Sequence, residues 1–235
     1  MSASKYRLLV PIPELGKDAV CADDVHDQLL QWKAAVEAKG GTLHANSLTR
    51  TVAQQQPLRD KYVAWLADGK PSPAVAAANK PGRSNHQGGR AIDVQTGGAF
   101  PHAPADKQVD LLWETGKPFG FTPIIASPDE SMSERWHFDA WNGWVHVKEH
   151  MGYDIACLCS ALDVGQAGEW QSDDRLLQAL LLRAGYDIGE PDGIWGGRSQ
   201  RGLRLAVGPA IVESKDLLAD RLRALPATPD WLRVS

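Results

Sequence analysis

Residues 84–93 read SNHQGGRAID and residues 134–137 read ERWH, and these two stretches decide how the chain is interpreted. Together they hold two histidines and two acidic residues, with a pair of glycines in the first stretch. Two neutral imidazoles and one carboxylate make a suitable catalytic zinc set, because three protein ligands leave the fourth tetrahedral position for water. Zinc lowers the pKa of that water from about 15.7 to about 7, which supplies hydroxide at neutral pH. The two stretches therefore favour a catalytic metal site.

The spacing within each stretch constrains the backbone around such a site. His86 and Asp93 are an odd number of positions apart and would face opposite sides of one regular strand. A turn at the glycine pair 88–89 removes this obstacle, because it lets His86 fold back toward Asp93 on the following strand. Glu134 would diverge from His137 within a strand, so we expect Glu134 in the loop before the strand or in a bulge.

The two stretches resemble the motifs of a known family, the D-alanyl-D-alanine zinc metallopeptidases, which include carboxypeptidases, dipeptidases and phage endolysin peptidases. The first family motif, S-x-H-x-x-G-x-A-x-D, is matched at every fixed position. The second motif, a Glu three residues before a His that follows a Trp, is also matched. The matching residues are Ser84, His86, Gly89, Ala91 and Asp93 in the first motif, and Glu134, Trp136 and His137 in the second.

The resemblance implies a role for each residue of the site. His86, Asp93 and His137 would bind Zn²⁺, and Glu134 would act as general base and general acid. The family also has an upstream Arg followed by Ser and Gln, and residues 49–55 look like this motif with Thr in place of Ser.

Arg50 is the cation of that upstream motif. A fixed cation would stabilise the oxyanion that forms when hydroxide attacks a peptide carbonyl, so we predict a catalytic role for Arg50. The alternative is an arginine that caps the start of a helix or pairs on the surface. Gln55 and Ser84 are predicted to orient the ligands or the ends of the substrate, and Trp136 is predicted to contact substrate.

Other polar residues have less support as site residues. His146 and His150 are four apart with Glu149 between them, but the order is not H-E-x-x-H, so we do not expect them to bind the metal. Asp139 lies on the same strand face as His137. It could be a partner of that ligand or a surface charge.

The three cysteines, Cys21, Cys157 and Cys159, cannot all pair within one chain, which fits folding in a reducing compartment. The C-x-C pair could suggest a metal site, but no second Cys pair and no nearby His support it. Buried free thiols are the alternative.

Charge and hydropathy exclude several classes of partner. The net charge of −4 and the pI near 6.0 argue against nucleic acid, because phosphate binding needs a broad basic surface. Pro11 and Pro13 interrupt the short apolar run near the N-terminus, so we expect no signal peptide. No apolar run approaches transmembrane length, so we expect no membrane partner.

Helices and strands are mixed without a repeating βαβ rhythm, which predicts an α+β fold with a small antiparallel sheet, flanking helices and the zinc site. An Asp is expected to cap the first helix, Pro57 to break or kink the second, and residues 69–89 to form a long loop that delivers residues to the site. Helices are predicted over residues 23–39, 51–66 and 105–113, and strands over 42–48, 90–94, 119–125 and 135–141.

A glycine-containing stretch at residues 164–170 looks like a linker. It would separate a catalytic domain, residues 1–164, from a second domain, residues 165–235. The second domain is predicted to contain three helices, over residues 173–184, through Leu203 and Leu205, and from about 211 to 225.

This second segment resembles the small three-helix peptidoglycan-binding module. It departs from the module after Gly196, where the usual Pro and Thr are replaced. The resemblance implies wall contacts by Tyr186, Asp192 and Trp195. The alternative is a module with only a structural role. The matching residues are Leu177, Leu180, Gly185, Tyr186, Asp192, Gly193, Ile194, Trp195 and Gly196.

The two resemblances together imply a zinc metallopeptidase that hydrolyses a peptide bond in the stem peptide or cross-link of peptidoglycan, as a D-Ala-D-Ala carboxypeptidase or an endopeptidase. Without a signal peptide, synthesis in the cytoplasm and action on the wall favour a phage-type lysin released through a holin, or a toxin injected by a contractile secretion machine. The alternative is a non-catalytic wall-binding protein with a structural zinc site. Glu134 argues against that alternative, because a structural site needs no base.

Overall fold

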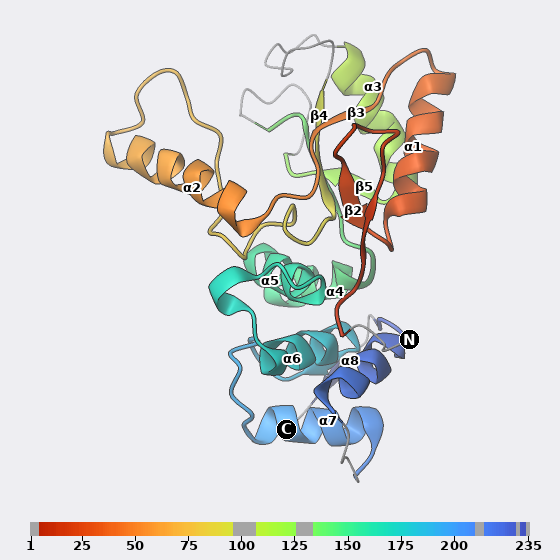
Figure 1. Cartoon of the computed structure of the whole chain (residues 1–235), viewed down its shortest axis with the longest axis vertical. Helices are drawn as coiled ribbons and strands as arrows, with labels where there is room; N and C mark the ends of the chain where they lie inside the picture. The colour runs from red at the N-terminus through yellow and green to blue at the C-terminus, as the bar shows by residue number, and fades with distance from the viewer. Residues whose placement is uncertain (1–4, 96–106, 126–133, 210–213, 229–230, 234–235) are drawn as a thin grey trace.

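A four-stranded antiparallel sheet forms the centre of the upper half of the molecule in Figure 1. The computed structural model describes residues 5–95, 107–125, 134–209, 214–228 and 231–233. The strands lie in the order β3-β4-β6-β5, and Asp93 on β4 pairs with His137 on β6. The predicted α+β fold with a small antiparallel sheet is confirmed. The strands are β3 (His44–Ser47), β4 (Ala91–Gln95), β5 (Phe121–Pro123) and β6 (His137–Ala140).

Two helices, α1 (His26–Ala38) and α3 (Lys107–Gly116), lie side by side and cover one face of the sheet (Figure 1). Trp32 of α1 stacks on Phe121, with ring centroids 4.9 Å apart, and meets the edge of Phe138 at 5.1 Å. A short hairpin of β1 (Leu9–Pro11) and β2 (Val20–Ala22) adds to the same apolar core. Successive strand residues point to opposite faces, so the His137 side chain lies on the face of β6 opposite to Phe138.

The start of α1 differs from the sequence-based expectation. Its first cap residue is Val25, and no side chain caps it. The two aspartates before it are held by arginines instead: Asp23 accepts from Arg7 Nη1 at 2.7 Å, and Asp24 accepts from Arg90 Nη2 at 3.2 Å. The predicted Asp cap is therefore wrong, because ion pairs with distant residues engage the carboxylates.

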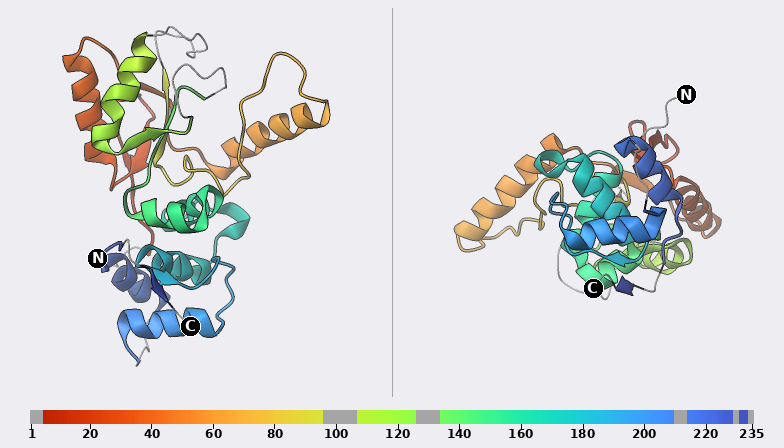
Figure 2. Two further views of the ribbon diagram at one scale, coloured as in Figure 1. Left: turned by 180° about the vertical axis from the view of Figure 1, so that it is seen from behind. Right: turned by 90° about the horizontal axis from the view of Figure 1, so that it is seen from below.

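Helix α2 (Val52–Ala67) projects from the body together with the loop that follows it (Figures 1 and 2). Thr51 caps it in a reciprocal arrangement with Gln54. Pro57 lies inside the helix without ending it, so the predicted break does not occur. The predicted long loop at residues 69–89 is confirmed, since no helix or strand lies between α2 and β4.

The lower half of the molecule consists of five helices that share one apolar core (Figure 2). Its buried residues include Trp144, Leu158, Leu180 and Leu222, so helices before and after the predicted domain boundary pack together. Within the described ranges, no helix is both long and apolar enough to cross a bilayer. The elements are α4 (Val145–Met151), α5 (Tyr153–Asp163), α6 (Asp173–Arg183), α7 (Gly197–Val207) and α8 (Lys215–Ala224), with a parallel pair of β7 (Tyr186–Asp187) and β8 (Leu232–Arg233).

The predicted linker at residues 164–170 is a packed turn followed by a short 3-10 helix, Gly168–Trp170. Gly165 adopts φ 75°, and the following Gln166 N–H donates to Ala161 O at 2.8 Å, which ends α5. Val164 and Ala167 are buried. The glycine thus serves as a helix terminator, and the predicted linker is a packed, hydrogen-bonded connection. The division of the chain at residue 164 stays a prediction.

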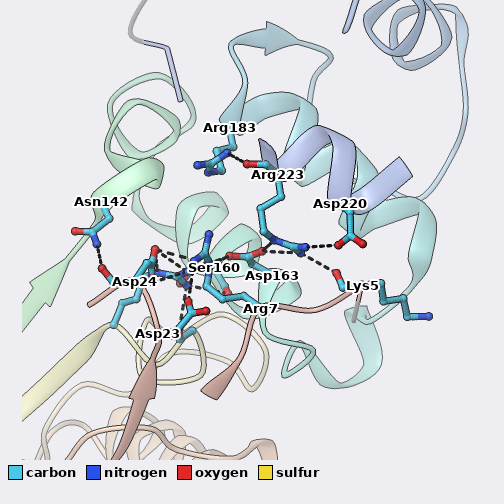
Figure 3. A network of polar contacts seen from close by, with 12 residues as sticks. Lys5, Arg7, Asp23, Asp24, Asn142, Ser160, Asp163, Arg183, Asp220 and Arg223 are labelled. Atoms are coloured by element: carbon cyan, nitrogen blue, oxygen red, sulfur yellow. Dashed lines mark hydrogen bonds and ion pairs between the residues drawn. The ribbon is translucent and has the colours of Figure 1, made fainter. Parts of the chain in front are cut away.

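Asp163, the last residue of α5, ties three distant segments together (Figure 3). Its buried carboxylate accepts from Arg7 Nε at 2.9 Å, Arg90 Nη2 at 3.0 Å and Arg223 Nε at 3.1 Å. Arg223 lies on α8, and Arg90 lies in the 84–93 stretch. Burial acts to raise the pKa of Asp163, but the three positive charges outweigh it and hold the pKa below its usual range.

Asp163→Asn should lower the free energy of unfolding by about 3–5 kcal/mol at neutral pH, because three guanidinium groups lose their shared negative partner. Urea denaturation followed by circular dichroism measures this. Asp173→Asn is the matched control: it breaks the partly exposed ion pair with Lys5, at 2.8 Å, and should cost about 1 kcal/mol or less. Equal effects of the two substitutions would contradict a structural role for Asp163.

Candidate metal centre

Three predicted ligands converge in the structure. His86, Asp93 and His137 are buried, and their ligand atoms all lie within 4.8 Å of one another. Asp93 Oδ2 is 3.2 Å from His86 Nε2, and Asp93 Oδ1 is 3.0 Å from His137 Nδ1. In the part of the chain that the structure describes, no other group of three or more His, Cys, Asp or Glu residues could hold a metal ion. The predicted convergence of the two stretches is confirmed.

The turn before β4 brings His86 back to the strand. Gly89 adopts φ 66°, and its N–H donates to His86 O at 3.1 Å. A side chain at Gly89 would come within 2.7 Å of the Ala22 backbone nitrogen, and one at Gly88 would overlap the Ser160 hydroxyl. The turn predicted at these glycines is confirmed, and the structure adds that both positions are too closely packed for a side chain.

Hydrogen bonds at the far side of each imidazole select the nitrogen that faces the cluster. His86 Nδ1 lies 2.6 Å from Leu48 O, a contact in which it must donate, so Nε2 carries the free lone pair. His137 Nε2 lies 3.1 Å from Asp139 Oδ1, so Nδ1 faces Asp93. Two imidazole nitrogens and a carboxylate suit zinc. In a tetrahedral zinc site the ligand atoms are about 3.3 Å apart, and the separations of Asp93 from the two histidines are close to this value.

The charges around these ligands favour a cation. Burial lowers the pKa of His86. For His137, burial also acts to lower the pKa, but the carboxylates of Asp139 and Asp93 outweigh it and raise the pKa well above its ordinary value. Burial would raise the pKa of Asp93, yet the two histidines hold it below its usual range. Asp93 therefore stays ionised, and its negative charge lies beside two imidazoles that can also bind a positive ion.

Glu134 lies in the turn just before β6, as the sequence predicts. Its carbonyl accepts from the His137 N–H at 3.0 Å, and its φ of 86° is unusual for a residue with a side chain. Such conformations cost about 1–3 kcal/mol and cluster at functional sites. Burial, with added repulsion from Asp93 and Asp139, raises the pKa of Glu134 to about 7. A carboxylate in this range can both accept and return a proton near neutral pH.

Arg50 reaches the centre from the segment before α2. Its Nη2 donates to Asp93 Oδ2 at 2.8 Å and to Ser47 Oγ at 3.1 Å, and its Nη1 donates to Gln55 Oε1 at 2.9 Å. Gln55 is buried and donates to Asn79 O, which fixes it against the long loop. The alternative of a surface or helix-capping Arg50 is wrong, because its side chain is held at the buried cluster and Thr51 caps α2.

A cleft of about 400 Å³ opens beside Arg50. It is lined by residues 16–19 from the β1–β2 hairpin, by residues 45–50 and by Gln54 and Leu58 of α2. Arg50 thus lines this cleft and also bonds Asp93, whereas the three metal ligands and Glu134 are not among the lining residues.

Two residues predicted to act at the substrate site, Trp136 and Ser84, are buried. Trp136 is only 7% exposed and packs in the core behind the sheet, which disagrees with direct contact to substrate. A large aromatic ring at this position gains more from burial with Phe138 than from exposure. Ser84 is buried in the turn before β4, where its N–H donates to Gln87 Oε1 at 3.2 Å.

His146 and His150, which have less sequence support, lie outside the cluster. His146 contacts Glu149 Oε2 at 3.0 Å, and His150 stacks on Trp231 with ring centroids 4.3 Å apart. The three cysteines are free and buried, as the alternative reading of the C-x-C pair expects. Asp139 is buried at His137, so the alternative of a surface charge is wrong.

The predicted wall-binding residues make internal contacts. Tyr186 is 8% exposed and belongs to the helical core, which disagrees with a wall contact through its ring. Asp192 accepts from Gln178 Nε2 at 3.1 Å and from the Ile194 N–H at 2.8 Å, so it stabilises its own turn. Trp195 is partly exposed, and its Nε1 donates to Asp174 Oδ1 at 2.6 Å.

Asn85 and Tyr153 both bond Asp139, and no motif in the sequence points to either residue. Asn85 occupies an unconstrained position of the first motif. Tyr153 follows both motifs on α5, and no spacing rule connects it to them.

A buried His-Asp-His cluster beside a glutamate of raised pKa defines the class of metal-dependent hydrolase sites. A model of the family described as VanY, D-alanyl-D-alanine carboxypeptidase, matches residues 19–142. This is more than half of the chain, and the chain belongs to this family. The match includes Arg50 and both motifs and ends before α4.

Three solved structures are similar to the chain. A mutant of the vancomycin resistance D,D-pentapeptidase VanY in complex with Zn(II) has 25% sequence identity and a TM-score of 0.44, over 56% of this chain and 78% of that chain. VanYB in complex with D-alanine-D-alanine has 24% identity and a TM-score of 0.44, over 56% and 77%. The D,D-dipeptidase VanXYg with a D-Ala-D-Ala phosphinate analogue has 24% identity and a TM-score of 0.43, over 66% and 67%. A comparison with curated proteins gave no match.

Proposed function

We propose that this protein is a zinc peptidase that cleaves the peptide part of bacterial cell wall, with the D-Ala-D-Ala end of the stem peptide as its substrate. The observation that carries the proposal is the buried cluster of His86, Asp93 and His137 with Glu134 beside it. Membership of a D-alanyl-D-alanine carboxypeptidase family supports the choice of substrate.

His86 Nε2, His137 Nδ1 and an Asp93 oxygen would hold the zinc. When bound, zinc lowers the pKa of water and polarises a carbonyl group. Glu134 then takes a proton from the attacking water while the oxygen of that water bonds to the carbonyl carbon of the peptide. Glu134 returns this proton to the leaving amine nitrogen as the C–N bond breaks.

Arg50 would stabilise the negative charge that develops on the carbonyl oxygen. Its bond to the ligand Asp93 supports this role, because it holds the guanidinium at the metal centre. Gln55 would keep the guanidinium in position, because it accepts from Nη1 and is itself fixed by Asn79 O.

Mass spectrometry of reaction products tests the proposed bond. The zinc-loaded protein is incubated with a soluble pentapeptide stem that ends in D-Ala-D-Ala and, separately, with cross-linked muropeptides. Release of one D-alanine from the stem is expected. Cleavage of the cross-linked material alone would make the protein an endopeptidase, and binding to sacculi with no product from either would favour the non-catalytic alternative.

We also propose that residues 165–235 bind the wall, as the resemblance to peptidoglycan-binding modules implies. The segment between β7 and α7 supports this, because Ile194 beside Trp195 is 70% exposed. A holin or a secretion machine is the partner that we propose for delivery to the wall.

Trp195→Ala should reduce the fraction of protein that sediments with purified sacculi. A soluble stem peptide should be cleaved at the wild-type rate, because the Trp195 ring nitrogen bonds Asp174 of α6 and the residue lies between β7 and α7, outside the elements that carry the metal ligands. Leu217→Ala on α8 is the matched control, since this residue is also exposed, at 54%. Equal sedimentation of both variants and the wild type would contradict a wall contact at Trp195.

A further inference from the structure

Asp139 is a buried carboxylate that three groups hold. It is 1% exposed, and its Oδ1 contacts His137 Nε2 at 3.1 Å. Asn85 Nδ2 donates to the same oxygen at 2.8 Å, and the Tyr153 hydroxyl donates to Oδ2 at 3.0 Å. A buried charge needs such partners, so Asp139 is fixed in one position against the imidazole.

Both of the other donors to Asp139 depend on α5. Tyr153 lies at the start of this helix, and Ser160 lies seven residues, or about two turns, further on the same face. The Ser160 hydroxyl donates to Asn85 Oδ1 at 3.0 Å and thereby orients the amide toward Asp139. Arg90 Nη1 donates in turn to Ser160 Oγ at 3.1 Å.

The 84–93 turn is seated directly on α5. Gly88 packs so closely on Ser160 that a side chain there would overlap the hydroxyl, and the Arg90 guanidinium bonds both Ser160 and Asp163. The same face of α5 therefore contacts the turn that carries His86 and, through Asp139, the second histidine ligand. This helix lies beyond the residues that match the family.

We infer that α5 positions the metal ligands, with Tyr153 as the positioning residue that holds Asp139 against His137. A carboxylate that accepts from one ring nitrogen fixes the tautomer and the plane of a metal-binding histidine, which leaves the other nitrogen as the ligand. The Tyr153 hydroxyl donates to Asp139 and not to His86, Asp93 or His137, so its effect on the ligands passes through Asp139. The inference rests on the proposed zinc site and does not depend on which peptide bond is cleaved.

Tyr153→Phe tests this, because it removes the hydroxyl and keeps the ring that packs edge-on against Trp141, with centroids 5.3 Å apart. Zinc affinity is measured by competition with a chromophoric chelator, and the ligand field by the visible absorption of the cobalt-substituted protein. We expect zinc to bind about tenfold more weakly, at the lower end of the loss typical for such partners, with a shifted cobalt spectrum. Tyr62→Phe on α2 is the matched control and should change neither.

A double-substitution cycle separates positioning from general support of the fold. In an Asp139→Asn background, Tyr153→Phe should cause little further loss of zinc affinity, because the carboxylate through which it acts is gone. Wild-type affinity and spectrum in Tyr153→Phe, or an undiminished effect in the Asp139→Asn background, would overturn the inference. Absence of peptidase activity in the wild type, with the expected changes in zinc affinity, would overturn only the proposed function.

Discussion

Glu134→Gln should lower kcat on a cell-wall peptide by roughly two to four orders of magnitude, the range typical of general acid-base catalysis. The glutamine amide has nearly the shape of the carboxylate but cannot take a proton from the attacking water. Zinc content should stay equimolar with protein, since Glu134 is separate from the cluster of three ligands. Steady-state kinetics and elemental analysis of the same sample measure the two quantities.

Glu149→Gln is the control for this experiment, because Glu149 is an exposed glutamate on α4 beside His146 and should leave both quantities unchanged. Loss of zinc together with activity in Glu134→Gln would make Glu134 a ligand. The proton-transfer role would then have to be withdrawn.

Loss of zinc is expected for each of His86→Ala, Asp93→Ala and His137→Ala, with activity falling to background. Each substitution removes one of three ligand atoms that lie within 4.8 Å of one another, and no other described His, Cys, Asp or Glu completes the set. Elemental analysis after dialysis against a chelator measures the metal. Circular dichroism of the metal-free proteins checks that each variant is folded.

His146→Ala and His150→Ala should keep zinc and most activity. Their rings contact Glu149 and Trp231 and lie outside the cluster. If either proved necessary for metal binding, the site would be larger than the three residues described or located elsewhere.

Local backbone chemistry explains why much of the site could be predicted. The glycine pair at residues 88–89 permits a turn with positive φ that other residues rarely adopt, and the turn returns His86 toward Asp93. The three-residue spacing of Glu134 and His137 excludes a common strand face and places the glutamate in the preceding turn. Such constraints act within about ten residues, so the sequence contains them in full.

The roles of single side chains could not be predicted where burial in the core decided whether a ring is accessible. Trp136 and Tyr186 belong to motifs, yet both rings are needed in the apolar cores and are removed from the surface. Gly165 has the composition of a linker, but its conformation ends α5 in a packed turn. Residue type alone does not distinguish a ring that binds from a ring that packs.

The sequence by itself determined the α+β class, the three converging ligands, the position of Glu134 and the turn that brings His86 to Asp93. Only the tertiary structure decided that α5 supports the centre through Tyr153 and Ser160, and that Asp163 joins Arg7, Arg90 and Arg223. The partners of Asp163 are up to 156 positions away. Contacts of this kind depend on how separate elements pack, because a hydrogen bond needs proximity in space and leaves no fixed spacing in the chain.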